Sequence, residues 1–240
     1  MIYIKVIFLL VIILGVIFWT RPKDKINNNL SPTPTVNLEQ KILPQSFKLE
    51  VPFTAQAPTG NWSDIKQGNG CEEASILMAY SWVLDREIDK ELARNEILKM
   101  SDFSLKLLGH FHDISNEDTI KLFKEYFKYE NVFLEKQVNI ENIKKILSEG
   151  KILIVAVDGD LLANPNYQIP KPANHKLVII GYDDNKQEFI THDPGTSKGD
   201  SYRYNYQKLI EAITDYPTGY KESFENINKS LIVVEKILNK

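Results

Sequence analysis

The sequence holds a single cysteine, Cys71, among its 240 residues. One cysteine cannot form an intramolecular disulfide, so a disulfide-stapled scaffold is excluded, as is a zinc site built from several cysteines. The predicted folded part also lacks a Lys/Arg run interleaved with aromatic residues, and the formal net charge of the chain is −3. A nucleic-acid partner is therefore not expected, because such proteins carry a basic patch.

The composition is that of a globular protein. Hydrophobic residues make up 43% of the chain and charged residues 25%. This balance is sufficient for a sizeable core, and the length suits one domain with appendages.

The first twenty residues differ from the rest in being almost uncharged. Residues 2–19 are apolar apart from Lys5, and a helix rising about 1.5 Å per residue would cross a hydrocarbon core of about 30 Å. No small-x-small cleavage site follows, so we expect residues 1–20 to be a single-pass transmembrane anchor or uncleaved signal. Arg21 and the lysines after it favour a cytoplasmic domain by the positive-inside rule, whereas an N-terminal signal-anchor favours an extracytoplasmic one, which we expect.

A tether and then the folded domain follow this segment. Residues 21–46 include a Ser-Pro-Thr-Pro-Thr run and have no sustained apolar periodicity, which predicts a flexible linker. Apolar residues begin to alternate with polar ones at Phe47, so we place the domain at residues 47–240. Helical patterns, including one over residues 87–100, dominate its first half and strand patterns its second half, which predicts an α+β fold. A strand is also expected over residues 47–53, and the alternating tyrosines of residues 202–206 predict a half-exposed strand without chemistry of its own.

Cys71 lies where a turn containing Gly68 and Gly70 passes into a helical pattern. The glycines are expected to allow a sharp turn of the backbone, which places the cysteine in the first turn of the helix. Unpaired N–H groups and the positive end of the helix dipole favour a thiolate there and could stabilise an oxyanion. A lone cysteine can instead be a small buried apolar residue.

Two carboxylates, Glu72 and Glu73, follow the cysteine directly. They suit the helix dipole but would oppose thiolate formation if they pointed at the sulfur. We therefore expect both to face away from Cys71, with one of them holding a structural hydrogen bond.

A histidine and an aspartate follow in the second half of the chain. His175 opens the apolar strand pattern of residues 177–182, and the returning strand of residues 188–192 ends at Asp193. In a hairpin the start of one strand faces the end of the next, so we expect His175 and Asp193 to be neighbours, as a base and its orienting carboxylate. His192 is an alternative base, but adjacent strand residues point to opposite faces, and the hairpin geometry favours Asp193.

Four separated blocks resemble the C39-like family of bacterial cysteine peptidases, which has a papain-like fold. The blocks are Val51-Pro52-Phe53 leading to Gln56, Cys71-Glu72-Glu73-Ala74-Ser75, His175 ahead of Gly181-Tyr182-Asp183, and His192-Asp193-Pro194-Gly195. The resemblance extends over residues 47–214, and the order Cys, His, Asp is that of papain-like enzymes. It implies an N-terminal helical part packed on a mainly antiparallel sheet, preceded here by the predicted transmembrane helix.

The resemblance also implies a glutamine that stabilises the oxyanion. Gln56 is favoured because it belongs to a family-like block, and Gln67, closer to the cysteine, is the second candidate. Trp62 and Asn174 are expected to line the substrate cleft, although Trp62 could equally cover the core. Leader-peptide processing is not expected, since members with that activity have an acidic residue before the cysteine and a glycine after it.

Together these features predict a membrane-anchored thiol hydrolase. We expect a cysteine peptidase that cleaves peptide or amide bonds of a peptide or protein substrate through Cys71, His175 and Asp193, without a cofactor. Two alternatives remain open: a catalytically idle envelope module that binds a peptide or cell-wall fragment, and an acyltransferase that uses the same triad. His110 and His112 suggest a zinc site, but the sequence offers no convincing further ligands, so no metal is expected.

Overall fold

The computed structural model describes residues 42–169, 171–219 and 229–237, and every structural statement below concerns these ranges. No helix within them has the length and apolarity needed to cross a bilayer. The predicted anchor at residues 1–20 and most of the predicted linker lie outside the described residues.

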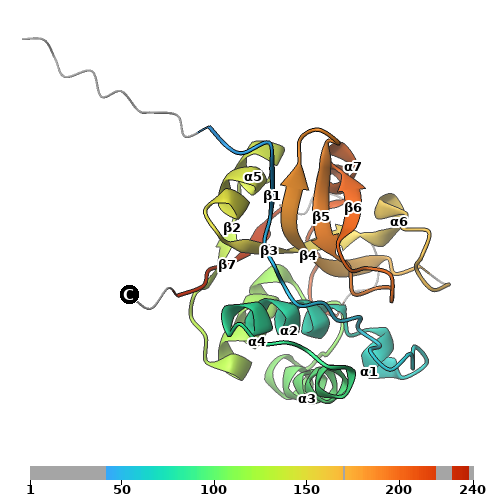
Figure 1. The fold of residues 1–240 in the computed structure, drawn as a ribbon. Helices are drawn as coiled ribbons and strands as arrows, with labels where there is room; N and C mark the ends of the chain where they lie inside the picture. The colour runs from blue at the N-terminus through green and yellow to red at the C-terminus, as the bar shows by residue number, and fades with distance from the viewer. Residues whose placement is uncertain (1–41, 170, 220–228, 238–240) are drawn as a thin grey trace, which may run out of the picture. The chain divides into compact units, whose positions relative to one another are not determined.

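The described residues form a seven-stranded antiparallel sheet at the centre of the domain (Figure 1). The strands are β1 (Ser46–Lys48), β2 (Val132–Glu135), β3 (Ile152–Asp158), β4 (Asn174–Asp183), β5 (Glu188–His192), β6 (Tyr202–Asn205) and β7 (Leu231–Val234). Their order is β2-β7-β3-β4-β5-β6, and β1 pairs with β4. The predicted antiparallel sheet of an α+β fold is confirmed.

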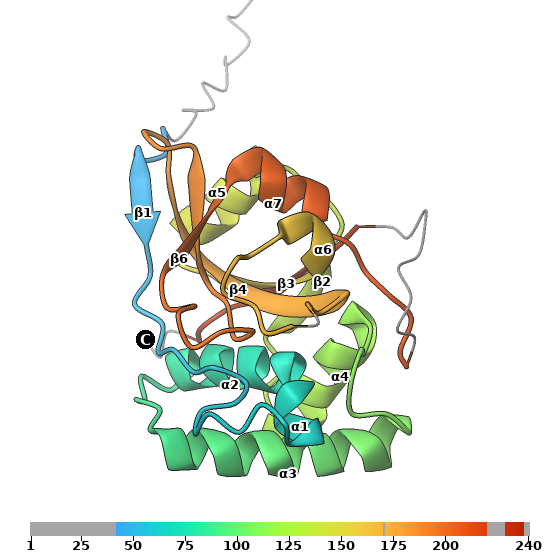
Figure 2. The ribbon, with the colours of Figure 1, turned by 90° about the vertical axis from the view of Figure 1, so that its right-hand side faces the viewer.

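Helices cover both faces of this sheet (Figure 2). The described helices are α1 (Ile65–Gly68), α2 (Cys71–Val83), α3 (Lys90–Leu108), α4 (Asn116–Phe127), α5 (Ile140–Ser148), α6 (Gly159–Leu162) and α7 (Tyr206–Ala212). Side chains of α2, α3 and α4 pack in one core cluster with one face of the sheet, and side chains of α5, α6 and α7 pack in a second cluster with the other face.

The alternation of β3 shows how the two cores share one strand. Ile152 and Ile154 belong to the cluster under α2, whereas Leu153 and Val155 belong to the cluster under α5 and α7. Because successive side chains of a strand point to opposite faces, a strand covered on both sides has an unbroken apolar sequence. The strongly apolar run of β4 has the same cause, and it fixes the strand that begins with Asn174 and His175 in the middle of the sheet.

Two boundaries differ from the sequence expectations. The helix predicted to end near Met100 continues to Leu108 and ends at Gly109, whose φ of 78° suits the left-handed C-cap. Ser101 is tolerated inside this buried stretch because its hydroxyl donates to Ile97 O at 2.9 Å. The strand predicted from Phe47 to about Phe53 pairs with β4 only over Ser46–Lys48.

Candidate active site

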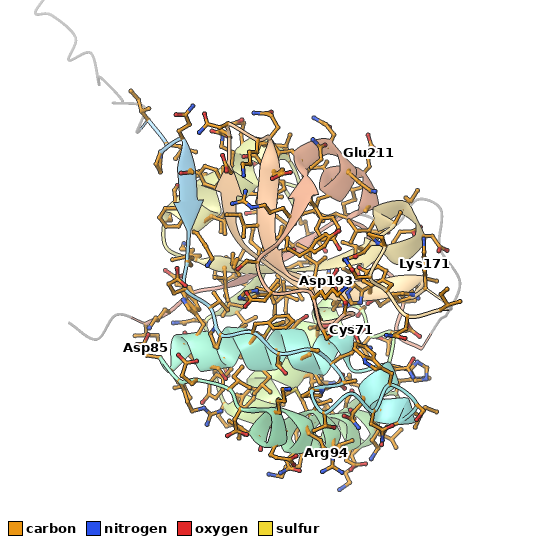
Figure 3. The ribbon with its side chains drawn as sticks, turned by 45° about the vertical axis from the view of Figure 1, so that its right-hand side comes forward. Cys71, Asp85, Arg94, Lys171, Asp193 and Glu211 are labelled. Carbon is orange, nitrogen blue, oxygen red and sulfur yellow. The ribbon has the colours of Figure 1, made fainter. Side chains whose placement is uncertain are left out.

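A cleft of about 810 Å³ lies between the start of α2 and the ends of β4 and β5. Its lining includes Gln56, Trp62, Cys71, Glu72, Asn174 and His175. Figure 3 shows Cys71 at the start of α2, on the side of the helical layer that faces the sheet, and His175 of β4 lines the same cleft. Residues more than a hundred positions apart therefore meet in one cavity.

Close packing explains the glycine that precedes the cysteine. Gly70 caps α2 with a φ of −92°, which any residue can adopt. A Cβ at this position would lie 2.8 Å from the carbonyl oxygen of Lys66 and 3.0 Å from Ile97 Cγ2. The expected turn before the helix is present between α1 and α2, but it uses no positive φ, and the glycine is required because α1 and α3 approach the backbone closely.

The thiol of Cys71 is surrounded more tightly than the sequence suggested. Its Sγ donates a hydrogen bond to Glu72 Oε2 at 3.0 Å. Burial, followed by the charge and the hydrogen bond of Glu72, raises the pKa of the Cys71 thiol. The expectation that Glu72 faces away from the sulfur is therefore wrong, and in this state the helix N-terminus does not by itself yield a thiolate.

His175 and Asp193 meet at the end of the hairpin formed by β4 and β5. His175 Nε2 lies 2.7 Å from Asp193 Oδ1, and both side chains are buried. Because Nε2 is engaged by the carboxylate, Nδ1 is the ring nitrogen left to accept a proton. The carboxylate thus selects the tautomer in which Nε2 carries the hydrogen.

Asp193 is held by several further donors. They are Tyr167 Oη at 2.8 Å, Tyr204 Oη at 2.5 Å, Asn164 Nδ2 at 3.2 Å and the backbone N–H of Gly195 at 3.0 Å. Burial alone would raise the pKa of Asp193, but the charge and hydrogen bond of His175 and the tyrosine donors lower it overall. The carboxylate is therefore ionised and fixed in orientation.

Sequence reasoning missed these donors. Tyr167 lies in the loop before β4, where no role was assigned to it, and Tyr204 lies in β6, a strand that was expected only to complete the core. The alternation of tyrosines over residues 202–206 was the available signal, since a buried Tyr hydroxyl needs a hydrogen-bond partner. Gly195 was also missed: a Cβ there would lie 2.9 Å from His175 Cε1 and 2.8 Å from Tyr167 Cε1.

His192 is buried on the other side of its strand. Its Nε2 donates to Val51 O at 2.7 Å, and its Nδ1 accepts from the N–H of Ser201 at 3.1 Å. Burial lowers the pKa of His192, so the neutral ring is favoured. Both nitrogens are used for structure, and His192 is absent from the cleft lining.

The two candidate glutamines have different surroundings. Gln56 lines the cleft, and its Nε2 donates to Gly68 O at 2.6 Å while its backbone N–H donates to Pro194 O at 2.9 Å. Gln67 is fully buried outside the cleft, and its side-chain amide has no hydrogen-bond partner among the described residues. The geometry therefore favours Gln56 as the residue next to the reacting carbonyl.

The remaining predicted residues also have defined places. Trp62 and Asn174 both line the cleft. His112 Nδ1 lies 3.0 Å from Asp113 Oδ2, and the rings of His110 and His112 are 6.4 Å apart. Within the described ranges, no group of three or more His, Cys, Asp or Glu side chains is arranged to hold a metal ion.

Comparison with a solved structure supports this architecture. A solved structure from Bacillus anthracis, provisionally assigned as a C39-like peptidase, is similar with a TM-score of 0.50 and 14% identity, covering 81% of this chain and 99% of that one. Xylellain, a cysteine protease from Xylella fastidiosa, has a TM-score of 0.49 and 13% identity, and the match covers 82% of this chain and 88% of that one. No curated protein sequence matches significantly. The family model of the Peptidase C39-like family matches residues 48–230, so the chain belongs to this family, and the prediction of a cysteine peptidase is confirmed at the family level.

Proposed function

We propose that this chain hydrolyses peptide or amide bonds with Cys71 as nucleophile, His175 as base and Asp193 as the residue that orients the base. The observation that carries the proposal is the 2.7 Å contact between His175 Nε2 and Asp193 Oδ1 beside a cleft that Cys71 also lines. A base whose other nitrogen is fixed by a buried carboxylate is the common element of triad hydrolases.

The first half of the reaction forms an acyl-enzyme. The Sγ proton passes to His175 Nδ1, and the thiolate attacks the carbonyl carbon of the scissile bond. Gln56 and the backbone N–H of Cys71 are the donors nearest to the developing oxyanion in this assignment. The imidazolium then donates its proton to the leaving amine as the C–N bond breaks.

The second half regenerates the enzyme. Water attacks the thioester, His175 takes a proton from that water, and the C–S bond breaks to release the carboxylic acid and the Cys71 thiolate. The imidazolium then returns its proton to Sγ, which restores the thiol and the neutral base. Asp193 keeps Nε2–H pointed at its Oδ1 throughout, which stabilises the imidazolium in both halves. Trp62 and Asn174, which line the cleft, are assigned contacts with the peptide substrate in this proposal.

Cleavage of a peptide library by the full-length protein in H₂¹⁸O tests this proposal. Hydrolysis places one ¹⁸O in each new C-terminus, whereas transfer of the acyl group to an amine places none. Products should be absent with Cys71→Ala and His175→Ala and present with His192→Gln, which is the matched control from the neighbouring strand. Turnover that survives in Cys71→Ala would refute the assignment.

One observation favours a second candidate, a peptide-binding module without turnover. Burial and Glu72 raise the pKa of the Cys71 thiol, so the nucleophile is neutral in the absence of substrate. A binding module would protect library peptides or retain them on the protein without yielding products. The same library experiment therefore separates the two candidates.

We also propose that residues 1–20 anchor the chain in the cell membrane as a single pass, with the catalytic domain outside the cytoplasm. The apolar run of residues 2–19 supports this. Alkaline extraction of membranes should leave the full-length chain in the pellet, and a protease added to intact cells without the outer wall should degrade the domain. A chain that is released by the extraction would contradict the anchor.

A further inference from the structure

Glu72 is a buried carboxylate in direct contact with the proposed nucleophile. Only 1% of the residue is exposed. Its Oε2 accepts the hydrogen bond from Cys71 Sγ at 3.0 Å, and its Oε1 accepts from Tyr216 Oη at 2.9 Å and from the N–H of Ile114 at 3.3 Å. Three donors from separate segments therefore fix both oxygens, and the carboxylate cannot turn away from the sulfur without breaking the others.

A buried lysine supplies the opposite charge. Lys176, in β4 directly after His175, is fully buried, and its Nζ lies 3.9 Å from Glu72 Oε1. Its Nζ also donates to Tyr216 Oη at 3.0 Å and to Ile114 O at 2.5 Å. Burying a carboxylate is costly unless it is hydrogen-bonded and paired with an opposite charge, and Glu72 has both kinds of partner.

We propose that Glu72 holds Cys71 as a neutral thiol in the free protein, and that Lys176 and Tyr216 position Glu72 for this role. This inference rests on the proposed function of Cys71 as nucleophile. In the resting state the S–H bond points at Glu72 Oε2 and not at the base. Activation requires the S–H to leave Glu72, after which its proton passes to His175 Nδ1, giving a thiolate and an imidazolium while Glu72 remains a carboxylate.

Other charged groups also face the sulfur. Asp113, from the loop before α4, adds a second negative charge that disfavours the thiolate, while Lys176 favours it. His175 lines the same cleft from β4, and Tyr216 approaches from the segment after α7. Glu72 differs from these groups because it accepts the hydrogen bond of Cys71 Sγ.

Glu72→Gln is the informative variant because it reverses the polarity at the sulfur. The amide oxygen can still accept from Tyr216 and Ile114, which turns the amide N–H₂ group toward Sγ. An acceptor that favours the thiol is thereby replaced by a donor that favours the thiolate. The rate of alkylation by iodoacetamide, measured from pH 5 to 10 on the full-length protein, reports the change cleanly because Cys71 is the only cysteine of the chain.

We expect the wild-type thiol to titrate above the free-thiol pKa of about 8.5 and Glu72→Gln to titrate at least one pH unit lower. The tenfold gain in thiolate is partly offset by the lower nucleophilicity of a less basic thiolate, so alkylation at pH 7 should be about three times faster. The limb of the kcat/KM profile that belongs to Cys71 should move to lower pH by the same amount.

Two further variants keep the test informative if Glu72→Gln leaves Lys176 unpaired and destabilises the fold. Glu72→Gln combined with Lys176→Met, compared with Lys176→Met alone, should show the same direction of shift without an unpaired ammonium. Glu73→Gln changes the adjacent buried carboxylate, whose oxygens accept no hydrogen bond within the described residues. This variant should leave the alkylation profile within about twofold of the wild type.

An unchanged or slower alkylation profile in both Glu72→Gln backgrounds would overturn the role of Glu72. This outcome is distinct from failure of the proposed function. If the proposed function fails, the wild-type protein will yield no cleaved peptides, or cleavage will survive in His175→Ala, whatever the alkylation profile shows.

Discussion

The two sides of the cleft treat their buried charges in opposite ways. The strand side consists of His175, Asp193, Tyr167, Tyr204 and Asn164. There the Asp193 carboxylate accepts hydrogen bonds from the four other side chains, and its pKa is lowered. On the helix side, defined by Cys71, Glu72, Lys176 and Tyr216, a carboxylate accepts from the thiol, and the pKa of Cys71 is raised.

This difference separates two requirements of a thiol hydrolase. The strand side presets the base, because the orientation and tautomer of His175 are fixed before any substrate binds. The helix side restrains the nucleophile, because the proton of Cys71 is held by a group that is not the base. A sequence motif that contains cysteine, histidine and aspartate is therefore not sufficient to state which group is ready to react.

The largest expected effect comes from Asp193→Asn on the strand side. An asparagine can present its N–H₂ group to His175 Nε2, which forces the hydrogen onto Nδ1, the nitrogen that must accept the thiol proton. By analogy with the Ser-His-Asp triad, kcat/KM for peptide cleavage should fall about 10⁴-fold. Thermal unfolding would establish that the variant is folded, and a folded variant that keeps more than a tenth of the activity would show that the base is not preset by Asp193.

The next effect distinguishes the two glutamines. Gln56→Ala removes a proposed oxyanion donor and should lower kcat by about 10²–10³-fold. Gln67→Leu is the matched control, since its amide is buried without a partner among the described residues, and it should keep activity and leave stability equal or higher. If the losses are reversed, Gln67 is the oxyanion residue and the geometric choice made here is wrong.

Tyr204→Phe weakens the strand side without removing the carboxylate. Loss of a buried donor to Asp193 should cost about 1–3 kcal/mol of unfolding free energy. Because the lowered pKa of Asp193 contributes stability that is complete above the unfolded value of about 3.9 and is lost as the pH falls through the folded value, the variant should lose stability at a higher pH. The hydroxyl of Tyr202 is not among the donors to Asp193 described above, so Tyr202→Phe should change neither quantity. Urea unfolding from pH 2 to 6 provides both.

A smaller effect should identify His192 as a structural histidine. Its pKa is lowered by burial, so the neutral ring stabilises the fold above the unfolded pKa of about 6.5, and this stability is lost as the pH falls through the folded pKa. The slope of unfolding free energy against pH between 5.5 and 7 should be positive, by at most about 1.4 kcal/mol per pH unit for this group, and smaller in His192→Gln. An unchanged slope would mean that another group titrates in this window.

The smallest effect is expected at the edge of the cleft. Trp62→Ala removes apolar contact area for the peptide but no group that touches the reacting atoms. The KM should rise several-fold with kcat unchanged, as for uniform binding. A fall in kcat without a change in KM would instead place Trp62 at the scissile bond.

Much of the fold was predictable because its signals are local. The start of α2 at Cys71 and the hairpin that ends at Asp193 follow from apolar periodicity and turn residues. These positions bring Cys71 and His175 to one cleft, with Asp193 in contact with His175. The extension of α3 to Leu108 was missed because its last turns carry buried serines in place of an apolar stripe.

The donors to Asp193 and the contacts of Glu72 could not be predicted in the same way. Tyr204 contacts Asp193 and Tyr216 contacts Glu72 from segments whose own patterns indicate only a half-buried strand or a loop. The direction of the Glu72 side chain depends on Lys176, more than a hundred residues away. Such long-range polar pairs leave no periodicity in the sequence, so only the folded arrangement reveals them.

The proposed hydrolysis depends most directly on Cys71 acting with His175. A peptidyl chloromethyl ketone, which alkylates an activated thiol, should add once per chain to the full-length protein, and mass mapping should locate the adduct on Cys71. The rate should fall at least tenfold in His175→Ala and remain unchanged in His192→Gln. Equal rates in His175→Ala and the wild type, or an adduct on a residue other than Cys71, would contradict the central claim.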